Sequence, residues 1–173
     1  EYGAMYLVMD RLEGRSFDEH LAAIEARGER MDVRELFELL DPIVATLEAA
    51  HARGIVHRDL KPENVFVLAP EAGGGVRLLD FGLAKVLRAS PLTAMGMIAG
   101  SPSYIAPESW HGDPRVLDHR IDVYAFGAIV FRALSGTVPF GAGSIAEKLL
   151  AATTAPRPSL HALRPDLPPE IDA

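Results

Sequence analysis

The chain has 173 residues, of which 49% are hydrophobic and 24% charged, and it contains no cysteine. This composition is typical of a globular protein with one hydrophobic core, and it excludes a disulfide framework and a cysteine-based zinc site. The formal net charge of −7 at pH 7 argues against sequence-independent binding to nucleic acid, which would require a surplus of basic residues.

The first predicted elements are a short strand and a short helix. Residues 5–9 form an apolar run that is typical of a strand, and Gly14 is expected in the turn that follows it. Ser16, with Glu19 three residues later, predicts a capped helix start. Leu21 would then lie on the buried face of this helix.

A longer helix is predicted from Asp32 onward, with Gly54 closing it. Its apolar residues recur at helical spacing: Leu36, Leu39, Leu40, Ile43, Val44 and Leu47. Pro42 lies inside this pattern, and we expect it to kink the helix or to delay its start, because proline lacks the backbone N–H that an interior turn needs.

The second half of the chain alternates between short strands, a long loop and helices. Residues 65–68 and 76–79 predict a β-hairpin, joined by a loop with three consecutive glycines. Residues 80–108 show no sustained period and are expected to form a long loop, which in a compact domain usually carries function. A buried helix is predicted over 121–135 and an amphipathic one over 144–153, followed by an irregular, proline-rich tail.

Three short motifs follow one another in this loop-rich part of the chain. They are HRDLKPEN at residues 57–64, DFG at residues 80–82 and APE at residues 106–108. In this order and at these spacings they resemble the signature motifs of protein kinases. The chain as a whole resembles the C-terminal lobe of a bacterial-type (eukaryotic-like) serine/threonine protein kinase.

The resemblance implies a fold and a division of the chain. We expect an α+β fold that is mainly helical, in which residues 1–173 form part of a kinase domain. Residues 1–14 would form the hinge strand, and residues 15–173 a C-terminal lobe truncated before its last helices, with the small N-terminal lobe missing.

The spacing of three oxygen-bearing side chains suits phosphoryl transfer. A loop that ends in Asn64 and is followed by a hairpin returning to Asp80 can bring both side chains close to Asp59. Transfer from ATP requires neutralised phosphate charge and an acceptor hydroxyl held in line, and magnesium prefers carboxylate and amide oxygens. By the resemblance, Asp59 is the base, Lys61 steadies the transferring phosphate, and Asn64 and Asp80 hold Mg²⁺, with Mn²⁺ also possible. Asp and Asn also commonly cap turns, which is the ordinary interpretation of such residues in isolation.

The resemblance also assigns residues to the adenine ring of ATP. Met9 would be the gatekeeper, while the carbonyl of Asp10 and the N–H of Leu12 would meet the adenine edge. Phe66, two residues after the proposed metal ligand, would form the apolar floor. The alternative for this first run of residues is an ordinary core strand.

Regulatory roles are implied for three residues around the catalytic motif. Arg58 would dock a phosphorylated residue of the long loop, and Thr93 is the preferred candidate, with Ser90 second. Ser101 occupies a position usually held by a threonine that bonds the catalytic Asp and Lys.

Four further residues are expected to support the site rather than to react. His57 and Phe81 would stack in a hydrophobic column anchored by Asp122, and we expect Asp122 to cap the start of its helix as well. Glu108 would pair with an arginine of a helix beyond residue 173.

We therefore expect ATP-dependent phosphoryl transfer to Ser/Thr hydroxyls of protein substrates by the full-length parent, and no turnover by these 173 residues alone, which lack the glycine-rich loop and the ATP-pairing lysine. Two alternatives remain open: a pseudokinase acting as a scaffold, and a small-molecule phosphotransferase of the aminoglycoside or choline type. Lys61 and the APE motif favour protein as the substrate.

No apolar run reaches the ~18 residues of a membrane span, so we expect a cytoplasmic region whose parent could still be anchored elsewhere. The sequence does not indicate an oligomeric state.

Overall fold

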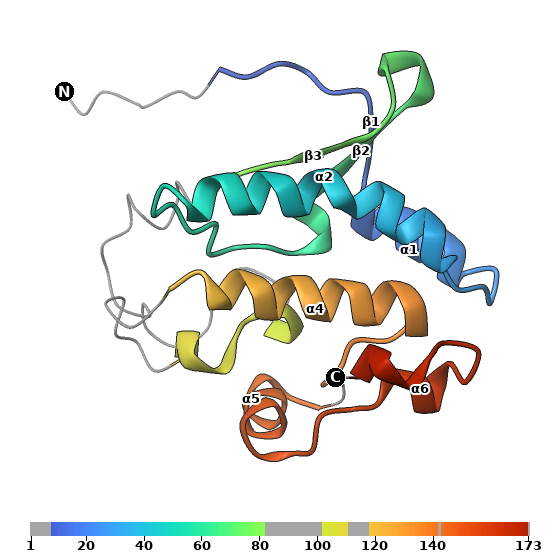
Figure 1. The fold of residues 1–173 in the computed structure, drawn as a ribbon, viewed down its shortest axis with the longest axis vertical. Coiled ribbons are helices and arrows are strands. Elements are labelled where there is room, and N and C mark those ends of the chain that lie inside the picture. Colours follow the sequence, from blue (N-terminus) through green and yellow to red (C-terminus); the bar gives the residue numbers. More distant parts are fainter. Residues whose placement is uncertain (1–7, 82–101, 111–117, 142, 173) are drawn as a thin grey trace.

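The computed structural model describes residues 8–81, 102–110, 118–141 and 143–172 (Figure 1). Its helices and strands, in chain order, are β1 (Gly14–Ser16), α1 (Phe17–Glu25), α2 (Val33–His51), β2 (Val65–Leu68), β3 (Val76–Leu78), α4 (Arg120–Ser135), α5 (Ile145–Thr154) and α6 (Leu160–Leu163). Short 3₁₀ turns occur at Pro62–Asn64, Pro70–Ala72, Pro102–Tyr104, Pro107–Trp110 and Pro169–Asp172. The fold is a mainly helical α+β arrangement, as predicted.

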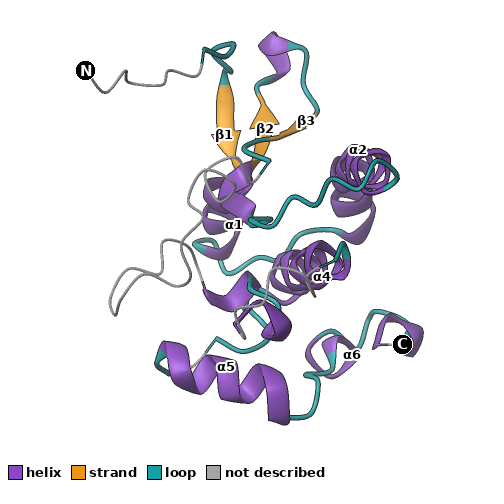
Figure 2. Ribbon diagram, turned by 90° about the vertical axis from the view of Figure 1, so that its left-hand side faces the viewer, coloured by secondary structure: helices purple, strands orange, loops and turns teal. Residues whose placement is uncertain are grey.

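Two long helices form the middle of the molecule. Helices α2 and α4 lie side by side, with the three-stranded sheet and α1 at one end and α5 and α6 at the other (Figures 1 and 2). The core between them consists of buried apolar side chains from nearly every element, including Phe17, Leu21, Leu36, Leu40, Ile43, Leu47, Val65, Ile129, Leu134 and Leu160. Helix α4 therefore lies between α2 with the sheet and α1 on one side, and α5 with α6 on the other.

Helix α1 begins where the sequence predicts. The Ser16 hydroxyl accepts a bond from the Glu19 N–H at 3.2 Å, and the Glu19 carboxylate accepts one from the Ser16 N–H at 2.8 Å. This reciprocal pair satisfies two amides that the first helical turn leaves without intrahelical partners. Leu21 is buried, as predicted.

The prediction for the residues before α1 is not met in the part that the structure describes. Residues 8–13 contain no strand, and Val8 is 93% exposed, while residues 5–7 lie outside the described part of the chain. Gly14 is not in a turn but begins β1, with a φ of 149°. A side chain there would collide with the carbonyl oxygen of Val67, so the close pairing of β1 with β2 requires glycine.

The predicted hairpin is confirmed, and it gains a third strand. The sheet is antiparallel in the order β1-β2-β3, with Ser16 opposite Phe66 and Val65 opposite Leu78. Three consecutive glycines, Gly73, Gly74 and Gly75, follow a 3₁₀ turn and have φ values of 94°, 63° and 81°. Few other residues would accept this left-handed run, which returns the chain to β3.

Helix α2 also begins at the predicted cap, since Asp32 Oδ1 accepts bonds from the N–H groups of Arg34 and Glu35 at 2.9 and 3.2 Å. Pro42 does not delay the helix, which runs through it without interruption from Val33 to His51. Four of the six predicted apolar residues are buried, Leu39 is partly buried, and Val44 is 37% exposed. The buried stripe is therefore narrower than the periodicity suggests.

The later helices agree with prediction in position but not in every detail. Helix α4 ends at Gly136, whose N–H donates to the Arg132 carbonyl at 2.7 Å, and α5 has a capping box formed by Ser144 and Glu147. The tail is not wholly irregular, because it contains α6, whose Leu160 N–H donates to the Asp172 carboxylate at 2.7 Å. Among the described helices, none combines the length and apolar character needed to cross a membrane.

Candidate active site

The site is built around one buried carboxylate in the first turn of α4. Asp122 is 1% exposed, and its two oxygens accept bonds from the backbone N–H groups of His57 and Arg58 at 2.8 and 2.9 Å. Its Oδ2 also lies 2.8 Å from Nε2 of His51, in the last turn of α2. These contacts join α2, α4 and the HRDLKPEN loop, as the predicted anchoring role requires.

The additional role of Asp122 as a helix cap is not what the contacts show. The N-cap residue of α4 is His119, and the bond at the helix start comes from Asp118, whose Oδ1 accepts from the Arg120 N–H at 2.9 Å. The bonds of Asp122 lead instead to the loop and to α2. Its charge still suits the positive end of the helix.

The loop that Asp122 holds has an unusual backbone. Arg58 adopts a φ of 67°, in the left-handed region where a residue other than glycine costs roughly 1–3 kcal/mol. This conformation allows two successive amides to converge on one carboxylate. The bonds to Asp122 offset the strain and hold the loop in this shape.

His57 is fully buried, which suits the packing role predicted for it. Its Nε2 donates to the Leu79 carbonyl at 2.9 Å, and its Nδ1 accepts from the Asp59 N–H at 3.3 Å, so the ring is neutral with the proton on Nε2. Burial lowers the pKa of His57, and the nearby negative charges only partly oppose this effect. The ring of Phe81 lies 4.9 Å away at an interplanar angle of 51°, so the two rings are in contact as expected, but in a tilted and not a stacked arrangement.

Asp59, Lys61 and Asn64 meet directly. The Asn64 Nδ2 donates to the backbone carbonyl of Asp59 at 2.7 Å and to its Oδ2 at 3.1 Å, and Lys61 Nζ lies 3.2 Å from the same Oδ2. Both side-chain contacts act on one carboxylate oxygen, so they set the orientation of the carboxylate. The Asp59 side chain remains 31% exposed and accessible to a reactant.

The hairpin returns the chain to the HRDLKPEN loop one residue before Asp80. The Leu79 N–H donates to the Asn64 carbonyl at 2.8 Å, while the Leu79 carbonyl accepts from His57, so the residue before Asp80 is tied on both sides. Asp80 has a φ of 52° and is exposed. The negative charges of Asp59 and Asp80 both act to raise the pKa of His57, against the larger lowering that burial causes.

The donor set fits a divalent magnesium ion. Asn64 uses its amide nitrogen for Asp59, which leaves its amide oxygen as the group able to bind a cation, and Asp80 adds a carboxylate. Within the described residues, no three His, Asp or Glu side chains gather into a group that could hold a metal. Magnesium commonly binds through one or two protein oxygens together with phosphates and water, so this sparse set is suitable.

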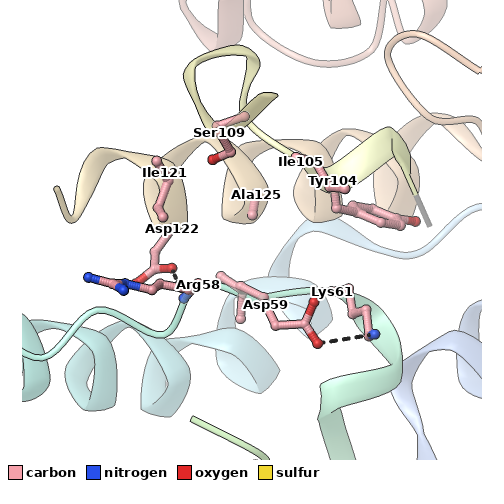
Figure 3. Close-up of a pocket in the computed structure, with 11 residues that line it drawn as sticks. Arg58, Asp59, Lys61, Tyr104, Ile105, Ser109, Ile121, Asp122 and Ala125 are labelled. Atoms are coloured by element: carbon pink, nitrogen blue, oxygen red, sulfur yellow. Dashed lines mark hydrogen bonds and ion pairs between the residues drawn. The ribbon is translucent and has the colours of Figure 1, made fainter. Parts of the chain in front are cut away.

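A pocket of about 50 Å³ lies between the loop and α4 (Figure 3). Its walls come from the catalytic motif, the segment 102–110 and α4: Arg58, Asp59, Leu60, Lys61, Tyr104, Ile105, Ala106, Ser109, Ile121, Asp122 and Ala125. Figure 3 shows Tyr104 on the opposite side of this pocket from Asp59 and Lys61. The sequence did not single out Tyr104 or His51. A tyrosine between the long loop and the APE motif, and a histidine at a helix end, were the available signals.

Not all of the residues assigned to the adenine ring lie close together. Met9 is 63% exposed and Asp10 is exposed, in the extended segment that precedes β1. Leu12 is half-buried near the start of β1, and the register of that strand sets Ser16 opposite Phe66. The end of the proposed hinge and the proposed apolar floor therefore lie on neighbouring strands.

Two of the regulatory residues, Thr93 and Ser101, lie outside the described residues. Glu108 is exposed in the Pro107–Trp110 turn, close to the start of α4. Burial, and secondarily the negative charge of Glu108, raises the pKa of Tyr124 on that helix. The arginine partner that the kinase resemblance implies for Glu108 is not among the described residues, so its pairing stays a prediction.

Comparison with known proteins agrees with this geometry. The protein kinase domain family matches residues 1–163. The chain is 40% identical over 166 residues to the serine/threonine-protein kinase Pkn1 of Myxococcus xanthus, covering 95% of this chain and 22% of Pkn1. It is 37% identical over 169 residues to PknA of Mycobacterium tuberculosis, covering 96% of this chain and 36% of PknA.

A solved structure shows the same fold. The kinase domain of PknI from Mycobacterium tuberculosis, in a mutant form, superposes with a TM-score of 0.63 at 28% identity, over 92% of this chain and 51% of that one. The chain thus spans about half of that kinase domain and about a fifth to a third of the two relatives' lengths. It belongs to the protein kinase domain family, as a region of a bacterial serine/threonine protein kinase catalytic domain.

Proposed function

We propose that this chain is the larger part of the C-terminal lobe of a kinase domain whose full-length protein transfers the γ-phosphoryl group of ATP to Ser/Thr hydroxyls of proteins. The observation that supports this most directly is the Asp59 carboxylate, oriented by Asn64 and Lys61 on a loop anchored by Asp122. Such an arrangement provides a base beside a cation. The names of the relatives favour protein as the acceptor.

Each polar residue has a separate task in this proposal. Asp59 accepts the proton of the acceptor hydroxyl, and Lys61 neutralises charge on the transferring phosphate. Asn64 and Asp80 hold Mg²⁺, or Mn²⁺, which when bound neutralises the phosphates of ATP. His57 and Phe81 support these groups by packing.

The adenine and regulatory assignments belong to the same proposal. Met9, Asp10, Leu12 and Phe66 would bind the adenine ring. Arg58 would receive a phosphate on Thr93, with Ser101 bonding the catalytic pair, and Glu108 would brace the segment. We expect this region in the cytoplasm, where ATP and protein substrates are supplied. The 173-residue segment alone is expected to be inactive, because its sequence contains no glycine-rich strand pair and no strand lysine to pair with ATP.

The test uses the full-length protein with Mg²⁺-ATP and a Ser/Thr-containing protein acceptor. Asp59→Asn should lower the phosphorylation rate by about 10²–10⁴-fold, the usual contribution of a positioned base. Asp41→Asn, an exposed acid on α2, is the matched control and should keep the wild-type rate. A wild-type protein without transfer would support the scaffold alternative, and transfer only to an aminoglycoside or choline would support the small-molecule one.

A further inference from the structure

One partly buried arginine connects three segments behind the pocket. Arg132 in α4 has a side chain only 15% exposed. Its Nη1 donates to Asp18 Oδ1 at 2.6 Å and to the Tyr104 hydroxyl at 3.2 Å. Its Nε and Nη2 donate to the two carboxylate oxygens of Glu25 at 2.9 and 3.1 Å. The guanidinium therefore bridges both ends of α1 to the Pro102–Tyr104 turn.

This position makes Arg132 the link between the helices and one wall of the pocket. Tyr104 is 5% exposed and lines the same pocket as Asp59 and Lys61 (Figure 3). The turn that carries Tyr104 packs against α4, so its position depends on contacts with residues far away in the chain. The hydroxyl bond to Arg132 is the side-chain contact that connects this turn to α1 as well as to α4.

The electrostatics of the cluster make the arginine hard to replace. Burial disfavours its charged form, but the bonds to Glu25 and Asp18 outweigh that effect and raise the pKa of Arg132. Burial raises the pKa of Tyr104, so its hydroxyl stays neutral near pH 7. Without Arg132, two carboxylates would remain in a partly buried site with no cation between them.

We propose that Arg132 is a positioning residue that holds the Tyr104 wall beside Asp59 and Lys61 and thereby sets the affinity for the protein acceptor, not for ATP. This inference rests on the proposed function. Of the groups assigned to ATP and its metal, Asn64 and Asp80 lie at the two ends of the hairpin, while Lys61, assigned to the phosphate that is transferred, lines the pocket itself. Tyr104 lies across the pocket from Asp59 and Lys61, on the side of α4 (Figure 3).

The test measures KM for the protein acceptor and for ATP separately in the full-length protein. Arg132→Lys keeps the charge but cannot make the forked contact, and Tyr104→Phe removes only the hydroxyl. Each should raise KM for the protein acceptor by about tenfold, the effect of one lost hydrogen bond to a charged group. KM for ATP should stay within about twofold. The double variant should be no worse than Arg132→Lys, because both changes remove the same contact.

Arg164→Lys is the control. Its side chain is 19% exposed and bonds Asp166 at 2.6 Å and the Leu134 carbonyl at 2.9 Å, so it is an arginine of similar burial away from the pocket. It should leave both KM values unchanged. An equal rise in the two KM values for Arg132→Lys, or an effect of Arg164→Lys as large, would overturn the proposal in favour of general destabilisation.

A second readout separates this proposal from the proposed function. Hydrogen exchange of the amides of residues 102–110 in the full-length protein does not depend on activity. These amides should exchange faster in Arg132→Lys and Tyr104→Phe but not in Arg164→Lys. Should the wild-type protein fail to phosphorylate proteins, the proposed function fails, and this exchange pattern still decides whether Arg132 holds the turn. Unchanged exchange in both variants contradicts the positioning role.

Discussion

Replacing Asp122 by asparagine tests whether one carboxylate holds the catalytic loop. In the wild type, the two carboxylate oxygens of Asp122 accept hydrogen bonds from two backbone N–H groups of the loop and from His51. Water cannot replace these donors, because Asp122 is only 1% exposed. Asparagine keeps the shape but turns one acceptor into a donor. At least one N–H group then loses its acceptor, because the side-chain NH₂ of the asparagine takes the place of a carboxylate oxygen and is itself a donor.

The size of the effect follows from the cost of an unsatisfied buried donor, about 1–3 kcal/mol, with a further contribution from the lost charge. We therefore expect Asp122→Asn to lower the free energy of unfolding by roughly 2–4 kcal/mol. The strained φ of Arg58 adds to the tendency of the loop to leave its position once the amides are released.

The assay is urea unfolding followed by far-UV circular dichroism, with the midpoint and slope compared with those of the wild type. The control is Asp118→Asn, which alters an exposed acid paired with Arg120 at the same helix start. We expect little change in its midpoint, because exposed ion pairs contribute little. An Asp122→Asn midpoint equal to that of the control would refute the anchoring role.

Three further predictions concern acidity, backbone and metal. Burial lowers the pKa of His57 from its ordinary value of 6.5. As the pH falls, His57 is therefore protonated in the unfolded chain before it is protonated in the folded chain, and this favours unfolding. Stability should therefore decrease from about pH 7 to pH 5 in urea unfolding, and His57→Gln should flatten this dependence; an unchanged slope would contradict the assignment. Gly14→Ala should destabilise the protein by more than about 1 kcal/mol, because the new methyl group meets the Val67 carbonyl at a positive φ, whereas Gly28→Ala, with open space around it, should cost less in the same assay. Asp80→Asn should reduce phosphorylation by the full-length protein about 10²–10³-fold and raise the Mg²⁺ concentration needed, as measured by a metal titration of the rate; wild-type behaviour would exclude Asp80 as a ligand.

Much of the fold could be predicted because the relevant signals are local. The caps at Ser16 and Asp32 and the glycine run before β3 involve partners within a few residues, so the letters alone indicate them. The catalytic motif was likewise readable, since Asp59, Lys61 and Asn64 lie within six positions and meet through one short loop.

Other features depend on segments that are far apart in the chain. Strand β1 was missed because it exists only through its pairing with β2, and its residues show no strand pattern of their own. The delayed helix start that Pro42 could have caused does not occur, since the tertiary packing of α2 outweighs the lost backbone bond.

The sequence by itself predicted helices α1, α2, α4 and α5, the hairpin and the kinase motifs, because short-range periodicity, capping and motif spacing specify them. Only the tertiary structure decided how distant segments are joined around α4: Arg132 reaches Glu25 and Asp18 across 107 and 114 positions, and Asp122, which the kinase resemblance already indicated as an anchor, also reaches His51 across 71. A buried charge must find its partners wherever packing brings them, and no local pattern encodes that meeting.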